Sequence, residues 1–140
     1  MARFSTGLRD ALASYYGLGL MMNDGIIRVY QGTRPGSPDD PPGATELAQI
    51  TEADGSGLLV MAVSPGILTK NGTWRLRASG PGTAQWWRWC WADPDPQTQS
   101  TYYPRVDGLV GTELILHSDT MYAGLDTTIE QFLFTLGLGT

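Results

Sequence analysis

The sequence predicts an all-β protein, an antiparallel β-sandwich of jelly-roll type with a short N-terminal helix. Runs with strand character follow one another along most of the chain, and turn residues separate them at intervals of about ten residues. Eighteen glycines and nine prolines among 140 residues supply these turns. Because this length is typical of one domain, we expect a single sandwich domain over residues 1–140.

A helix is predicted only near the N-terminus, over residues 5–17. Apolar side chains recur there at the spacing of one helix face, and Ser5 or Thr6 can cap the first turn. The apolar face consists of Leu8, Ala11, Leu12 and Tyr15. We expect this face to pack against one edge of the sandwich.

About eight strands are predicted after the helix, because the segments are rich in β-branched and aromatic residues and several alternate polar with apolar positions. Asn71-Gly72 between two such segments predicts a type I′ hairpin turn. The expected strands are 25–32, 46–51, 58–63, 73–79, 84–92, 104–110, 113–117 and 127–136.

The strand over residues 84–92 carries four of the five tryptophans. Alternation along the strand places Trp87, Trp89 and Trp91 on one face, and Trp86, Arg88 and Cys90 on the other. We expect the first face to form the sandwich core. On the outer face, Trp86 and Arg88 are expected to form a stacked pair or to anchor a partner.

Two polar loops, 33–45 and 93–103, interrupt the strands. The first holds four prolines and is expected to be irregular and exposed. Asp39-Asp40 and Asp93-Pro94-Asp95 offer carboxylates to a calcium ion, but neither has the full ligand series of a calcium loop. We therefore predict turns at both places, with no metal and no cofactor.

Charge and composition exclude several classes of function. The net charge is −5, which disfavours binding to nucleic acid, and no apolar segment is long enough to cross a membrane. We see no secretory signal, and a single cysteine, Cys90, excludes an internal disulfide. One histidine, His117, and four unpaired glutamates do not suggest a catalytic site, so we do not expect an enzyme.

The order of several segments carries a resemblance. These segments are Thr6-Gly-Leu-Arg-Asp-Ala-Leu, Gly25-Ile-Ile-Arg-Val-Tyr-Gln-Gly, Leu68-Thr-Lys-Asn-Gly-Thr-Trp, Gly82-Thr-Ala-Gln-Trp-Trp-Arg, Arg105-Val-Asp-Gly-Leu-Val-Gly-Thr and a closing Thr-Ile-Glu-Gln-Phe strand. In size and order the chain resembles the capsid decoration (cement) proteins of tailed bacteriophages, in particular those of short-tailed phages. The resemblance implies a jelly-roll homodimer that clamps neighbouring major capsid subunits from outside the shell, after assembly in the host cytoplasm.

An alternative from another class is a carbohydrate- or receptor-binding module of the virion or tail that uses Trp86 and Trp74. For the capsid-binding function, we expect contacts through the N-terminal segment 1–6 and the loop 33–45, since proline lowers the entropy lost when a loop is ordered. The candidate partner-binding residues are Arg3, Phe4, Arg34, Pro35, Pro38, Pro41, Pro42, Trp86 and Arg88.

Overall fold

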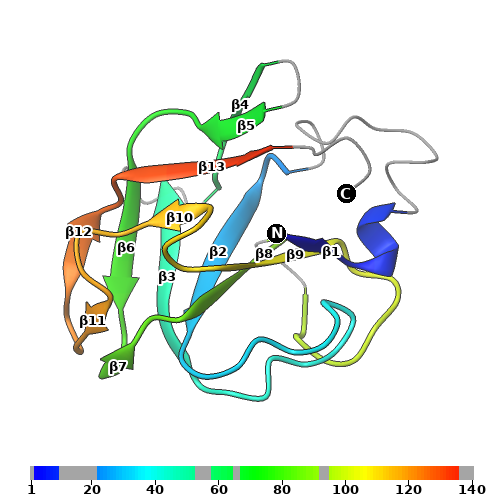
Figure 1. The fold of residues 1–140 in the computed structure, drawn as a ribbon, viewed down its shortest axis with the longest axis horizontal. Helices are drawn as coiled ribbons and strands as arrows, with labels where there is room; N and C mark the ends of the chain where they lie inside the picture. The colour runs from blue at the N-terminus through cyan, green and yellow to red at the C-terminus, as the bar shows by residue number, and fades with distance from the viewer. Residues whose placement is uncertain (1, 10–21, 53–57, 65–66, 92–94, 136–140) are drawn as a thin grey trace.

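The structure is a computed structural model that describes residues 2–9, 22–52, 58–64, 67–91 and 95–135 (Figure 1). Within these residues the chain forms thirteen strands and one short helix, and every strand pair is antiparallel. The predicted all-β, sandwich-like fold with a short N-terminal helix is therefore confirmed.

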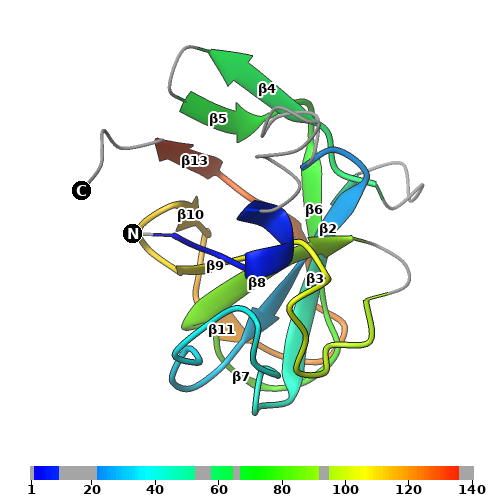
Figure 2. The same cartoon turned by 90° about the vertical axis from the view of Figure 1, so that its right-hand side faces the viewer.

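Two sheets make up the sandwich, and Figure 2 shows them as separate layers. The larger sheet contains, in spatial order, β1 (Arg3–Phe4), β9 (Arg105–Leu109), β8 (Trp86–Trp91), β2 (Gly25–Tyr30), β3 (Glu46–Glu52), β6 (Trp74–Ala78) and β12 (Asp126–Thr128). The smaller sheet contains β10 (Leu114–Ile115), β13 (Gln131–Thr135), β5 (Ile67–Lys70) and β4 (Met61–Ser64). A two-stranded ribbon joins β7 (Gly82–Thr83) to β11 (Thr120–Met121).

The core lies between the two sheets and is built around tryptophans. Trp87 and Trp89 of β8 are fully buried on the inner face, as alternation along the strand predicts. Phe132 of β13 meets two tryptophans of the larger sheet, with its ring centroid 5.1 Å from that of Trp87 and 5.4 Å from that of Trp74 in β6. These aromatic contacts join the two layers.

A glycine on the neighbouring strand makes room for one of these large rings. Gly108 of β9 is the cross-strand partner of Trp87, and a Cβ atom at this position would overlap the indole. Only a residue without a side chain fits here, because any larger residue would force the buried ring to move.

The short helix covers residues 6–9 in the described part of the chain. Ser5 caps it, because its Oγ accepts a hydrogen bond of 3.2 Å from the backbone N–H of Leu8. Leu8 is fully buried, as expected from its place on the apolar face. The rest of the predicted helix, with Leu12 and Tyr15, lies outside the described residues.

Two predictions about strand connections are wrong, since both connections cross between the sheets. The segment Asn71-Gly72 joins β5 to β6, which belong to different sheets, and only Gly72 has a positive φ, whereas a type I′ turn needs two. The predicted closing strand 127–136 is two strands, β12 and β13, also in different sheets. Ile129 lies at the crossover and donates its N–H to the carbonyl of Trp74.

Candidate binding site

A row of polar side chains crosses the outer face of the larger sheet. Cross-strand partners point to the same face of a sheet, so one register line can be followed through all seven strands. In strand order the line consists of Arg3, Asp107, Arg88, Arg28, Gln49, Arg77 and Asp126. The end at β6 and β12 is half exposed, with 50% of Arg77 and 45% of Asp126 accessible, whereas Arg88 and Asp107 are fully buried. Other parts of the chain must therefore cover half of this row.

Two arginine–aspartate pairs occupy the covered half. Arg88 donates two hydrogen bonds to Asp107, of 2.7 and 2.9 Å. Arg105 donates two to Asp95, of 2.8 and 2.7 Å. All four side chains are buried, and the two-pronged geometry matches a guanidinium to a carboxylate, which offsets part of the cost of removing these charges from water.

The cover consists of the proline-rich segment 31–45, which we term the proline loop, together with residues 95–104 (Figure 1). Arg88 donates to the carbonyl of Asp40 at 2.9 Å, and Arg105 donates to the carbonyl of Pro38 at 3.1 Å. Arg3 of β1 donates to the carbonyls of Pro35 and Gly36 at 3.1 and 3.0 Å. Three arginines of the sheet therefore hold the backbone of the proline loop in place.

The helix holds the same loop from its other side. The carboxylate of Asp39 accepts hydrogen bonds from the backbone N–H and the hydroxyl of Thr6, and the carbonyl of Asp39 accepts one from the N–H of Ser100. Asp39 and Asp95, which the sequence offered as metal ligands, thus bind groups of the protein. Within the described residues, no three acidic, histidine or cysteine side chains gather as a metal site would require.

Trp86 and Arg88 are not on the surface, so the expectation that they anchor a partner is wrong. They do form the expected stack, with the guanidinium carbon of Arg88 5.6 Å from the Trp86 ring centroid, and Tyr30 stacks on the indole at 4.4 Å. Both side chains are nevertheless fully buried. Alternation places them correctly on the outer face, but it does not show that loops cover that face.

The remaining candidates divide by exposure, and the proline loop is less exposed than predicted. Pro38 is buried, Pro35 and Pro42 are partly buried, and Pro41 is exposed. Phe4 is partly buried against the core. The N-terminal segment and the proline loop lie against the protein's own sheet.

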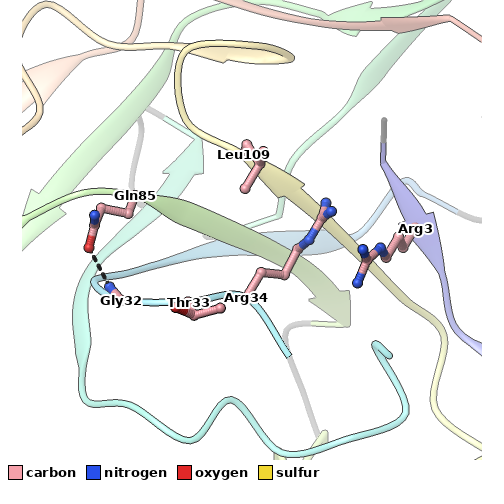
Figure 3. Close-up of a pocket in the computed structure, with 6 residues that line it drawn as sticks. All are labelled: Arg3, Gly32, Thr33, Arg34, Gln85 and Leu109. Atoms are coloured by element: carbon pink, nitrogen blue, oxygen red, sulfur yellow. Dashed lines mark hydrogen bonds between the residues drawn. The ribbon is translucent and has the colours of Figure 1, made fainter. Parts of the chain in front are cut away.

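The structure brings two of the candidates together in one pocket. Arg3 and Arg34 line a pocket of about 360 Å³ and reach toward each other from β1 and from the proline loop (Figure 3). The sequence places both among the partner-binding candidates but gives no reason to pair them, because they are far apart along the chain. The complete lining among the described residues is Arg3, Gly32, Thr33, Arg34, Gln85 and Leu109.

The pocket floor is fixed by the turn that follows β2. Gly32 has a φ of 96°, which favours glycine, and its N–H donates a hydrogen bond of 2.6 Å to Oε1 of Gln85. Burial and the neighbouring charge of Arg3 together lower the pKa of Arg34, although the carboxylates of Asp107 and Glu113 act in the opposite direction. Two like charges are therefore held close together.

The structure also shows the surroundings of Cys90, of His117 and of the two tryptophans in the carbohydrate-binding alternative. Burial raises the pKa of the Cys90 thiol to about 11. His117 is half exposed, with its Nδ1 2.9 Å from Oε1 of Glu130. Trp74 and Trp86, on which the carbohydrate-binding alternative depends, are both fully buried, so neither presents a ring face to a saccharide.

Comparison with known proteins finds no matching family model, no matching curated protein and no matching solved structure. Among the described residues, no helix has the length and apolar character needed to span a membrane.

Proposed function

We propose that this chain is a structural virion protein that binds the outside of a tailed-phage capsid and holds neighbouring major capsid subunits together. The class of partner comes from the resemblance in segment order. The resemblance also implies an all-β sandwich with a short N-terminal helix, and the described residues form such a fold. It further implies a homodimer, and two-fold homodimers are the commonest closed assembly.

The observation that carries the proposal is the fixed proline loop. A loop that is already ordered loses little conformational entropy when it binds, so more of its contact energy appears as affinity. Arg3, Arg88 and Arg105 hold this loop through its carbonyls, and Asp39 ties it to the helix. The loop therefore offers a preformed, irregular surface of the kind that a clamp between two rigid subunits requires.

A co-sedimentation assay tests the proposal. Purified protein is mixed with undecorated heads of the phage that encodes it, and the fraction that pellets with the heads is measured. We expect saturable binding of wild type. Absence of binding, or binding that does not saturate, would overturn the proposed function.

A pair of glycine variants tests the part that the loop plays. Gly36 lies in the proline loop and Gly80 in a turn after β6, and at both positions a Cβ would meet no atom within 4 Å. Gly36→Glu adds a charged side chain to the proposed contact surface and should weaken head binding. Gly80→Glu adds the same charge elsewhere and should not. If the two variants bind phage heads equally well, the proline loop is not part of the interface.

The homodimer is tested separately, by size-exclusion chromatography with light scattering at micromolar protein concentration. A mass of twice 15.2 kDa is expected. A mass corresponding to one chain would contradict the dimer. It would not decide whether the protein binds the capsid, which the sedimentation assay tests.

A further inference from the structure

The segments that cover the larger sheet present a surface without exposed charge. We term the exposed residues of the proline loop and of residues 95–104 the cover surface. They are glycine, proline, alanine, threonine and glutamine, together with one aromatic residue, Tyr102. The charged residues of the two segments, Arg34, Asp39, Asp40 and Asp95, are buried or partly buried. Depletion of charge is typical of the core of a protein–protein interface.

Exposed charges lie at the border of the cover surface. Arg3 donates to carbonyls of the proline loop, and Arg9 donates to the hydroxyl of Thr6, which in turn binds Asp39. Both arginines are exposed. An uncharged core inside a polar, solvent-accessible rim is the usual arrangement of a protein–protein interface, so the cover surface fits a protein partner.

Tyr102 is the large side chain that the cover surface exposes to solvent. It is 72% exposed, and it lies beside the proline loop because the N–H of Ser100 donates to the carbonyl of Asp39. Burying this ring against a partner would remove apolar area from water, which is favourable. Tyrosine is also among the residues enriched in the few positions that carry most of the binding energy of an interface.

Three contacts fix the backbone at Tyr102. Its N–H donates to Oγ of Ser100 at 3.0 Å, and Oγ of Ser5 donates to the carbonyl of Tyr103 at 2.9 Å. Gly7 of the helix lies so close that a Cβ at its position would overlap the carbonyl of Tyr102. The exposed ring is therefore carried by a fixed segment.

The ring is also supported from within the protein. Tyr103 meets it edge to face, with the two ring centroids 5.1 Å apart. The guanidinium carbon of Arg105 lies 5.8 Å from the Tyr103 ring centroid, and Arg105 is paired with the buried Asp95. A ring that is already oriented in this way loses little conformational entropy when a partner covers it, so more of its contact energy appears as affinity.

We infer that Tyr102 anchors the capsid contact, by entering an apolar pocket of a capsid subunit whose edge offers a hydrogen-bond partner to the phenol hydroxyl. The inference rests on the proposed function for the identity of the partner. A capsid subunit is the occupant because Tyr102 adjoins the proline loop, which that function places against the shell. A pocket of this kind matches the apolar ring and the polar end of a tyrosine.

The first test compares tyrosine variants in the head-binding assay. Tyr102→Ala removes the anchor, and the dissociation constant should rise about thirtyfold or more. Tyr102→Phe keeps the ring and loses one hydrogen bond, so the rise should be less than about tenfold. Circular dichroism and thermal unfolding establish that the variants are folded.

Tyr122→Ala is the matched control. Tyr122 is 57% exposed and directly follows β11, which lies on the opposite side of Figure 1 from the helix. Its removal should change the dissociation constant less than about threefold, because single exposed apolar side chains outside an interface need no partner.

The second test uses wild type alone and therefore does not depend on the folding of a variant. The free protein and decorated heads are exposed to hydroxyl radicals, and oxidation of each tyrosine is measured by mass spectrometry. We expect Tyr102 to be oxidised in the free protein and to lose this reactivity on heads. Tyr122 should be oxidised equally in both.

The outcomes separate the anchor from the function. If wild type binds heads but Tyr102→Ala binds equally well, or Tyr102 stays reactive on heads, the anchor is wrong and the capsid function stands. If wild type does not bind heads, the function is wrong and the capsid is not the occupant. If Tyr102 is protected in the free protein at micromolar concentration and becomes reactive on dilution, a second copy covers it, and the assignment to the capsid is wrong.

Discussion

At the scale of single residues, two buried arginines, Arg88 and Arg105, fix the proline loop on the larger sheet through hydrogen bonds to its carbonyls. Arg88 and Arg105 are fully buried, although charged residues are seldom found in that position unless paired. The period of the strand predicts that Arg88 points away from the tryptophan core, and it does. Its burial could not be predicted, because it depends on loops that are distant in the sequence and return over the sheet.

Removing the partner of one buried arginine should be strongly destabilising. Asp107→Asn leaves the Arg88 guanidinium buried without its carboxylate, so we expect the free energy of unfolding to fall by about 3–5 kcal/mol. Asp126→Asn breaks the exposed pairs with Arg75 and Arg77 and should cost less than about 1 kcal/mol. Urea unfolding measures both. Similar effects of the two variants would show that the buried pair has no special role.

The thiol of Cys90 should be unreactive in the native state. Its pKa is raised to about 11 by burial, whereas an ordinary thiol in the unfolded chain ionises near pH 9. The contribution of this group to stability is therefore fully present below about pH 9 and is lost as pH rises toward 11. We expect an aromatic disulfide reagent at pH 8 to modify Cys90 only in denaturant. Rapid modification of the native protein would contradict its burial.

At the level of elements, the sequence predicts most long strands and misses most of the short ones. Strand character in the sequence, from alternation or from β-branched and aromatic content, identifies β2, β3, β6, β8 and β9 closely, because each has five or more residues. It does not identify β1, β7 or β11, each of two residues, since no period can be read from two positions. It also cannot show which sheet a strand joins, and for that reason it predicts a single strand over residues 127–136.

Ser5 fixes the N-terminal segment through hydrogen bonds to the helix, to β9 and to the residues that precede β9. Ser5 Oγ accepts from the N–H groups of Leu8 and Arg105 and donates to the carbonyl of Tyr103, and the serine itself is fully buried. Ser5→Ala leaves these backbone groups without a partner and should cost about 1–3 kcal/mol.

Ser118→Ala provides the matched control. Its Oγ accepts one hydrogen bond, from the N–H of Thr120, at an exposed position, so the cost should stay below about 1 kcal/mol. Thermal unfolding of both variants decides the matter. If Ser5→Ala melts with wild type, the N-terminal segment is not fixed in this way. Truncation of residues 1–6 is consequently a poor probe of binding, because it removes this serine together with β1.

For the molecule as a whole, the buried core between the two sheets, which includes three tryptophans, contributes strongly to stability. Trp89 is fully buried in that core, and Trp89→Ala should lower the free energy of unfolding by about 3–5 kcal/mol. Tyr122→Ala removes an aromatic ring that is 57% exposed and should change it by less than about 1 kcal/mol. Chemical denaturation followed by far-UV circular dichroism compares the two. A small effect at Trp89 would contradict a tryptophan core.

The outer face of the larger sheet is the surface through which we propose that the protein binds the capsid. Its covered half holds the proline loop, and the two buried arginine–aspartate pairs beneath keep this loop in place. A capsid-binding protein of this design should meet the shell through that face, with its smaller sheet turned away.

A reconstruction of decorated phage heads tests this account most directly. The account predicts paired sandwich densities on the outside of the shell, with the proline loop against the capsid. Heads that carry no such density, or sandwiches whose proline loop faces solvent, would contradict it.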